Sequence, residues 1–162
     1  MRKSPRLTDY DYAATGSYFI TACSKNMERR FGEVIAGELR LNDAGKMVSN
    51  VWTANAERYP GVAIDEYIVM PNHFHGIVHI GTDPTIDQLK HSLVEIVATF
   101  KSLSTGEYSV GVKNGDFPAF DRSLWQRSFY DRVLRDANDI ERAREYIWAN
   151  PARWWQRRND HD

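Results

Sequence analysis

The sequence predicts an α+β fold in which helices pack on an antiparallel sheet, and the ferredoxin-like architecture is its closest common form. Neighbouring strand-like segments are joined by turns too short for a parallel crossover, as at Pro71-Asn72, which favours antiparallel pairing. Segments with helical periodicity separate the other strands, so we expect the helices to pack on a face of one sheet. The chain has 162 residues, and this length predicts a single domain over residues 1–162.

The N-terminal half predicts a strand, a hairpin and a helix. Residues 17–22 are rich in aromatic and β-branched side chains, which favour a strand. Residues 31–41 have two short apolar pieces around a glycine and predict a hairpin. Residues 42–58 have apolar positions at helical spacing, and Asn42 is a suitable N-cap for that helix.

The middle of the chain predicts two further strands and a long helix. Residues 62–70 and 74–80 read as strands joined by a short turn. A helix is expected to begin at Thr85, and an apolar stripe at helical spacing follows it as far as Leu103.

The C-terminal third predicts a loop, a strand and a final helix. Residues 107–122 contain glycines and a proline without a clear period, so we expect a loop. Residues 128–134 predict a strand, and residues 138–150 predict a helix. We expect Pro151 to end that helix because proline lacks an amide donor.

Composition excludes several classes of protein. The chain is 42% hydrophobic and 27% charged, which excludes disordered, collagen-like and coiled-coil chains. Its single cysteine, Cys23, excludes a disulfide framework and a cysteine-built zinc site. No apolar run reaches the roughly 18–20 residues of a membrane span, and the N-terminal residues do not resemble a signal peptide. We therefore expect no membrane contact and a cytoplasmic location.

The distribution of charge points toward nucleic acid, although the net charge of −1 does not. Nine arginines lie between residues 122 and 158, against five acidic residues. Aromatic side chains are interleaved with them, and arginine holds phosphate while aromatic faces stack on unpaired bases. The alternative is a set of solvated arginines.

The strongest local motif is His73-Phe74-His75. Residues two apart on a strand point to the same face, so the two imidazoles would converge as ligands for one metal ion. His79 has the same parity and would lie further along that face. The alternative is a pair of unrelated histidines in a sheet.

A second candidate group lies on the final helix. Arg142, Tyr146 and Asn150 are spaced four residues apart and therefore share one edge, beside a separate apolar stripe. Tyrosine can act as a nucleophile through its phenolate. The alternative is a tyrosine packed on the flank of the helix.

Four stretches together resemble the single-tyrosine HUH transposases, and most of all their REP-associated tyrosine transposase branch. These stretches are DEYIVMPNHFHGIV, FKS at residues 100–102, LWQRSFYDRVLRD and REYIWANPARW. They occur in order, and the resemblance covers nearly the whole chain. It implies an RRM-like HUH endonuclease core.

The resemblance also implies a mechanism and its residues. His73 and His75 would hold a divalent metal, Mg or Mn, with Asn150 as third ligand in place of the glutamine frequent in insertion-sequence relatives. Tyr146 would be the nucleophile that cuts single-stranded DNA near a hairpin and forms a 5′-phosphotyrosine link. Rejoining to a 3′-hydroxyl needs no ATP. The implied partner is single-stranded DNA with hairpins, and a homodimer is a possible assembly.

The DNA-contact candidates are basic residues near these motifs and at the start of the chain. They are Arg2, Lys3, Arg6, Lys101, Arg127, Arg132, Arg135 and Arg142. For Lys101 a solvated side chain is an equal alternative. Trp125 could stack on a base, although closure of the core is favoured. Because imidazole ligands favour Mn over Mg, Mn should substitute well.

Two other functions compete with DNA strand transfer. One is a binding module with a silent active site, which would hold hairpin DNA or RNA without cutting it. The other is a metal-dependent hydrolase in which the histidine pair activates water and Tyr146 is structural. The hydrolase would form no covalent adduct, and Tyr146→Phe would keep its activity.

Overall fold

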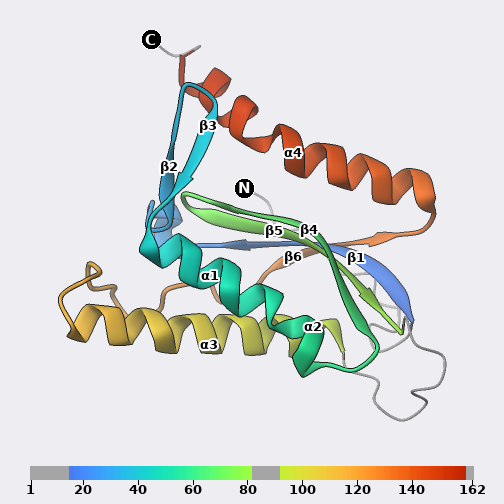
Figure 1. Cartoon of the computed structure of the whole chain (residues 1–162), viewed down its shortest axis with the longest axis horizontal. Helices are drawn as coiled ribbons and strands as arrows, with labels where there is room; N and C mark the ends of the chain where they lie inside the picture. Colours follow the sequence, from blue (N-terminus) through green and yellow to red (C-terminus); the bar gives the residue numbers. More distant parts are fainter. Residues whose placement is uncertain (1–14, 82–91, 160–162) are drawn as a thin grey trace.

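A four-stranded sheet forms the centre of the molecule (Figure 1). The computed structural model describes residues 15–81 and 92–159. Within them the strand order is β4-β5-β1-β6, and each neighbouring pair is antiparallel. The strands are β1 (Gly16–Cys23), β4 (Val62–Met70), β5 (His73–Ile80) and β6 (Tyr130–Leu134). This arrangement confirms the predicted α+β class.

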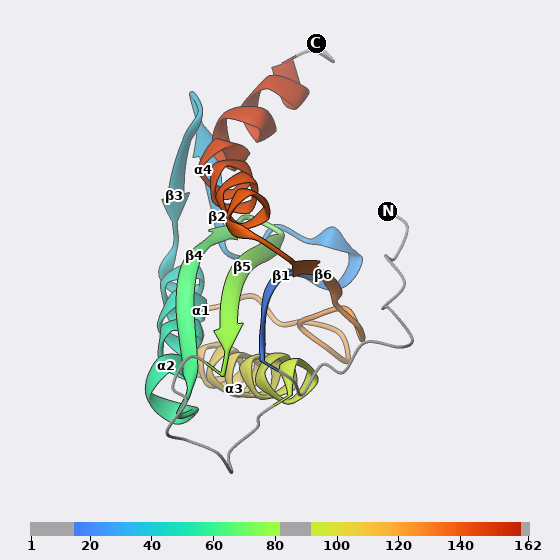
Figure 2. The same cartoon turned by 90° about the vertical axis from the view of Figure 1, so that its right-hand side faces the viewer.

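Helices cover both faces of this sheet (Figure 2). Helices α1 (Asp43–Thr53) and α3 (Leu93–Lys113) lie against one face, and α4 (Ala137–Asn159) lies against the other. Short helix α2 (Asn55–Arg58) follows α1, and a single 3-10 turn, η1 (Lys25–Met27), follows β1. The hairpin of β2 (Gly32–Ile35) and β3 (Glu38–Leu41) rises beside the C-terminal part of α4.

The main core lies between the sheet and helices α1 and α3. Alternate strand residues point to this face, so Phe74 of β5 meets Trp52 of α1 and Phe100 of α3. Their ring centroids are 4.7 Å and 4.9 Å from that of Phe74. A Cβ at Gly76 would lie 2.9 Å from both Trp52 and Phe74, so a glycine lets Trp52 sit directly on β5.

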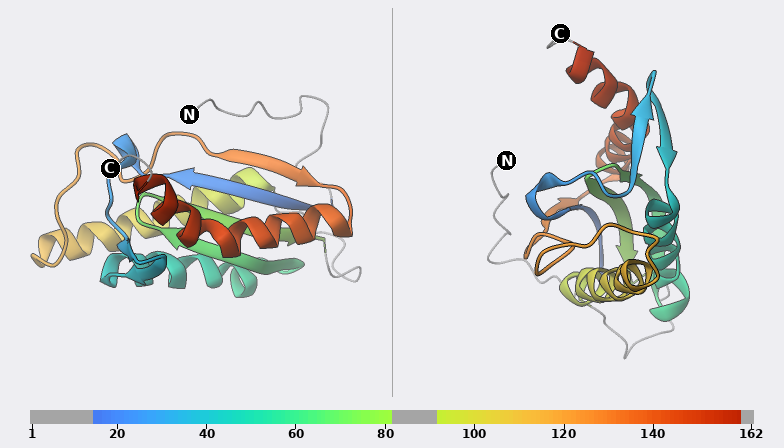
Figure 3. Two further views of the ribbon diagram at one scale, coloured as in Figure 1. Left: turned by 90° about the horizontal axis from the view of Figure 1, so that it is seen from above. Right: turned by 90° about the vertical axis from the view of Figure 1, so that its left-hand side faces the viewer.

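A smaller apolar cluster attaches α4 to the opposite face. Ile77 and Leu134 of the sheet pack there against Ala143 and Ile147 of the helix. Seen from above, α4 runs along β4 and β5 (Figure 3). The residues that point to this face are therefore those that can meet the side chains of α4.

One predicted boundary of the long helix was wrong, and the other lies outside the described residues. The expected start at Thr85 lies outside the described residues, but Ser92 is extended and caps α3, which begins at Leu93. The expected loop over residues 107–122 begins later, because α3 continues to Lys113. Tyr108 and Gly111 are both buried there, and a ring of Phe117 occupies the space beside Gly111. Because Gly111 has no side chain, the hydrophobic pattern of the sequence does not reveal this contact.

Pro151 does not end the final helix, contrary to prediction, and α4 continues to Asn159. The proline removes only one backbone hydrogen bond. Beyond the proline, Arg29 from another segment lies over the ring of Trp154, and Arg153 lies back over the ring of Tyr146 in the same helix. No helix among the described residues is long and apolar enough to cross a bilayer.

Candidate active site

The histidine pair lies on β5 and points toward α4. The ring centroids of His73 and His75 are 4.7 Å apart, with an interplanar angle of 72°. Nδ1 of His73 is 2.7 Å from Oδ1 of Asn72, and Nδ1 of His75 is 2.8 Å from Oγ1 of Thr21. Because these partners engage Nδ1, each ring presents Nε2 to the space beneath α4.

Both imidazoles are neutral near physiological pH. Burial lowers the pKa of His73 to about 4; a hydrogen bond to Asn150 opposes this, and the charge of Arg157 lowers the pKa slightly further. Burial lowers the pKa of His75 to about 3, helped by neighbouring His73. A neutral imidazole keeps the lone pair that a metal ligand needs.

The donor set fits a divalent metal held by two imidazoles and one amide. Asn150 is 8% exposed and lies within hydrogen-bonding reach of His73. Its Nδ2 donates to the carbonyl of Tyr146 at 3.0 Å, which leaves Oδ1 as its available donor atom for a metal. The described residues hold no group of three histidine, cysteine, aspartate or glutamate side chains, so the amide would be the third protein ligand.

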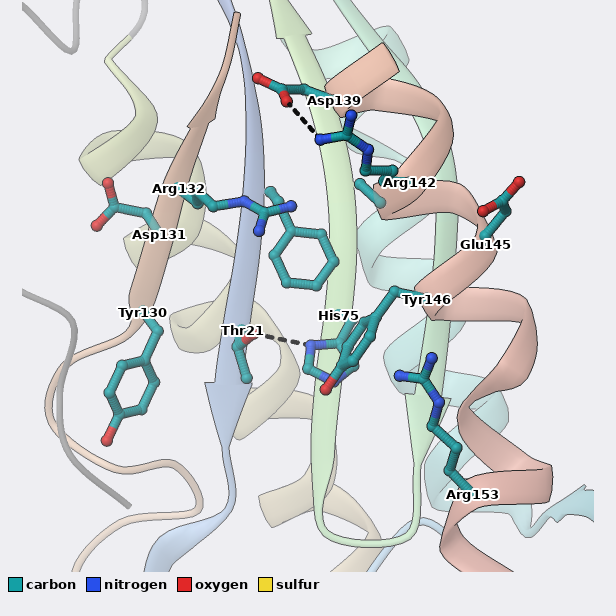
Figure 4. A pocket seen from close by; sticks show the side chains of 12 residues that line it. Thr21, His75, Tyr130, Asp131, Arg132, Asp139, Arg142, Glu145, Tyr146 and Arg153 are labelled. Carbon is teal, nitrogen blue, oxygen red and sulfur yellow. Dashed lines mark hydrogen bonds and ion pairs between the residues drawn. The ribbon is translucent and has the colours of Figure 1, made fainter.

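Tyr146 lies directly over this pair, one helical turn before Asn150. Its ring centroid is 5.4 Å from that of His75 and 5.8 Å from that of Phe19. Its side chain is 38% exposed. Figure 4 shows the Tyr146 hydroxyl beside the imidazole of His75, with Arg153 reaching back toward it. The fold thus brings together the four residues expected to carry the chemistry.

Two clefts flank Tyr146 and His75. The larger, of about 610 Å³, extends toward β6 and is lined by Phe19 and Arg132 among others. The smaller, of about 340 Å³, extends past His73 and Asn150. Tyr146, His75 and Arg153 line both clefts. The two clefts therefore meet at these three side chains.

The predicted DNA-contact arginines, together with Lys3, divide into three groups. Arg132 and Arg142 line the larger cleft. Arg127 and Arg135 are exposed and line neither cleft. The remaining N-terminal candidates, Arg2, Lys3 and Arg6, lie outside the described residues.

Lys101 lies away from both clefts. Its Nζ donates to the carbonyls of Gln126 and Ser128, at 2.8 Å and 3.0 Å. These bonds fasten α3 to the segment before β6. Trp125 in that segment is 3% exposed and donates through Nε1 to Oγ of Ser104, so the expected core role is confirmed.

A polar network that the sequence did not reveal ties α4 to β4. Arg144 donates through Nε and Nη2 to the two carboxylate oxygens of Asp65, at 2.9 Å and 2.7 Å. This guanidinium holds the pKa of Asp65 well below its usual range. His79 lies between Asp65 and Ser17, 2.7 Å and 2.6 Å from their oxygens, so it belongs to this network and not to the histidine pair.

The structure also adds arginines that the sequence did not single out. Arg153, Arg157 and Arg158 lie on α4 beyond Pro151, and Arg29 follows η1. Continuing the helix through the proline would have found Arg153, because it lies seven residues after Tyr146 on the same face.

Comparisons with known proteins find relatives of this chain both by sequence and by structure. No protein-family profile matches the chain. A Haemophilus influenzae protein described as uncharacterized is 36% identical over 175 residues, covering 96% of this chain and 91% of the relative.

The structural neighbours are both described as transposases. One is a REP-associated tyrosine transposase bound to a REP hairpin, with 20% identity and a TM-score of 0.55 over 94% of this chain and 74% of that chain. The other is a candidate transposase from Deinococcus radiodurans, with 15% identity and a TM-score of 0.54 over 91% and 95%. The chain therefore belongs to the same family as the Haemophilus influenzae protein and has the fold of a REP-associated tyrosine transposase.

Proposed function

We propose that the protein is a transposase-type enzyme that cuts and rejoins single-stranded DNA, with Tyr146 as the nucleophile. One observation carries the proposal: the Tyr146 ring lies 5.4 Å from His75, over two neutral imidazoles and one turn from a buried amide. If Tyr146 were only packed on the flank of the helix, it would not be expected to lie beside His73, His75 and Asn150. The fold is that of a protein solved with a REP hairpin, and it supports hairpin-bearing single-stranded DNA as the substrate.

His73, His75 and Asn150 would hold the metal, Mg or Mn. When bound there, such an ion supplies positive charge against the non-bridging oxygens of a phosphodiester. Asn72 and Thr21 fix the orientation of the two imidazoles through Nδ1, so the ligands are arranged before a metal arrives.

The covalent step is a transesterification at phosphorus. The Tyr146 oxygen forms a bond to the scissile phosphorus, and the bond from phosphorus to the 3′-oxygen breaks. The phenol proton passes to solvent, and the leaving 3′-oxygen takes up a proton to become a 3′-hydroxyl. A second 3′-hydroxyl can reverse the step on the phosphotyrosine, and no ATP is needed because the phosphodiester bond energy is kept.

Arg153 and Arg132 would orient the substrate around this step. Arg153 is placed 5.0 Å from the centroid of the Tyr146 ring, at the boundary of the two clefts. Arg132 extends over Phe19 on the other side of the larger cleft. Guanidinium groups at these positions can pair with the phosphates on either side of the tyrosine.

The nucleophile and the proposed ligands come from one chain. Tyr146 lies against His75 of its own copy, so the proposed reaction does not require a second subunit. A homodimer remains a prediction.

The experiment is a denaturing gel for a protein–DNA adduct. End-labelled single-stranded hairpins from the DNA flanking the coding sequence are incubated with Mg, with Mn and with chelator. We expect a metal-dependent shifted band that Tyr146→Phe abolishes. Tyr67→Phe is the matched control, because Tyr67 bonds Ser49 on the opposite face of the sheet and should leave the band unchanged.

The other outcomes separate the competing functions. Hairpin binding without an adduct under any metal would indicate a binding module. Cleavage without an adduct that persists in Tyr146→Phe would indicate a metal-dependent nuclease and would contradict the proposal.

A further inference from the structure

The smaller cleft is lined by four arginines and by no acidic residue. Arg29 approaches from the segment before β2, and Arg153, Arg157 and Arg158 approach from the last turns of α4. Among the described residues, none of these guanidinium groups forms an ion pair with a carboxylate. By contrast, Arg144 on the same helix forms ion pairs with Asp65 and Glu141.

Trp154 gathers two of these guanidinium groups in one place. The guanidinium carbons of Arg29 and Arg158 lie 5.4 Å and 5.9 Å from the centroid of its ring. Burial lowers the pKa of Arg29, and the nearby positive charge of Arg158 lowers it further. The two guanidinium groups are therefore close enough to repel each other. Like charges held together without a counter-ion make an anion-binding site.

The position of the cleft indicates which anion it would take. It is continuous with the candidate active site through Tyr146, His75 and Arg153, which line both clefts. If the scissile phosphate of a single DNA strand lies at Tyr146, the neighbouring phosphates lie on either side of that point. The four arginines line the smaller cleft, which extends from Tyr146 past His73 and Asn150.

We propose that this arginine cleft binds the backbone phosphate next to the scissile one and thereby sets the path of the single strand. The inference rests on the proposed function, and it assigns a binding site to the part of α4 beyond Pro151. Trp154 is a positioning residue in it, because its ring holds Arg29 and Arg158 at the cleft through cation–π contacts.

The test measures binding of fluorescein-labelled single-stranded oligo(dT) by anisotropy, in chelator, across a range of salt concentrations. Each lost phosphate contact should reduce the slope of log K against log salt by about 0.7. We expect Arg29→Gln and Arg157→Gln each to show this reduction and to weaken binding by about tenfold at low salt. Lys113→Gln is the matched control, because it removes one exposed positive charge at the end of α3, on the other side of the sheet.

Two tryptophan variants test the positioning role separately from charge. Trp154→Leu should weaken oligo(dT) binding although no charge is lost, and Trp154→Phe should restore most of it because an aromatic face remains. Thermal unfolding of each variant identifies any that fail to fold. Arg29 and Arg157 are exposed, so their variants should fold. A lower unfolding temperature for Arg29→Gln would report the loss of its contact with Trp154.

An unchanged salt slope in the Arg29→Gln, Arg157→Gln double variant would overturn the inference. An equal reduction of the salt slope in Lys113→Gln would also overturn it, because that result would mean general electrostatic attraction. Failure of the wild-type protein to bind oligo(dT) at low salt would overturn it as well. The proposed function can fail on its own. If binding depends on the arginines but no hairpin forms an adduct, Tyr146 is not the nucleophile, while the phosphate site in the cleft is still supported.

Discussion

The orientation of single side chains decides what the candidate site can do. Thr21 and Asn72 engage Nδ1 of the two histidines, and burial keeps both rings neutral. The Asn150 amide is fixed by the carbonyl of Tyr146 in the preceding turn. Each potential ligand is therefore held by a neighbour that uses its other polar atom, which is the usual arrangement around metal-binding histidines.

The hydrogen bonds of Lys101 favour a structural role for this side chain over a contact with DNA. We predict that Lys101→Met lowers the free energy of unfolding by about 2 kcal/mol, because two charge-assisted hydrogen bonds to Gln126 and Ser128 are lost. The salt slope of oligo(dT) binding should stay at the wild-type value. Urea titration and anisotropy measure the two quantities, with Lys113→Met as the control on the same helix. Unchanged stability together with a smaller slope would restore Lys101 as a DNA contact.

Helix α4 is the element on which the site depends. It carries Tyr146, Asn150 and Arg153, and its apolar contact with the sheet is limited to a small cluster. A register shift between Ile64 and Tyr67 places an extra residue in β4, and Asp65 lies within this bulge. Bulges commonly redirect a side chain, and here the carboxylate of Asp65 meets Arg144, two residues before the tyrosine.

We predict that this ion pair fixes the position of the nucleophile. Asp65→Asn should slow adduct formation by about 10- to 100-fold, because a small displacement of a reacting group costs that much, while oligo(dT) binding is retained. Glu141→Gln is the matched control, since Glu141 contacts the same guanidinium from an exposed position. Equal adduct rates for the two variants, measured in single-turnover gels, would show that the ion pair does not position the helix.

The two faces of the central sheet are covered differently, by α1 and α3 on one side and by α4 on the other (Figure 2). Helix α3 buries seven residues over a length of 21, whereas α4 buries three over a length of 23. The sheet and its α1 and α3 layer therefore form a stable base, and α4 is the layer that can open with the smallest loss of contact.

This difference predicts the pattern of amide hydrogen exchange. Amides of α4 should exchange faster than those of α3 at the same pH, because α4 can detach without unfolding of the main core. Mass spectrometry of peptic peptides measures both helices in one sample, so α3 serves as the internal control. Equal protection of the two helices would mean that α4 opens only when the whole domain unfolds.

The strands and the placement of the candidate site residues could be predicted from sequence because their signals are local. Residues 62–70 and 74–80 read as strands around a short turn, and the period of a strand predicted the shared face of His73 and His75. The spacing of Tyr146 and Asn150 gave their shared helix edge. These features depend only on the period of a strand or a helix.

The features that were missed depend on tertiary contacts. Beyond Pro151, Trp154 of α4 meets Arg29, which lies far away in the sequence. Lys101 bonds carbonyls that only the fold brings to it, and Asp65 reaches Arg144 through a bulge. No pattern within a short window of sequence contains these partners.

The most direct test of the account is to identify the residue linked to DNA. The adduct is digested with trypsin and nuclease, and the peptide that retains a nucleotide is sequenced by mass spectrometry. Cleavage after Arg144 and Arg153 releases residues 145–153, in which Tyr146 is the only tyrosine. We expect a nucleotide mass on Tyr146 of this peptide. A nucleotide on any other peptide, or cleaved hairpin DNA with no linked peptide, would contradict it.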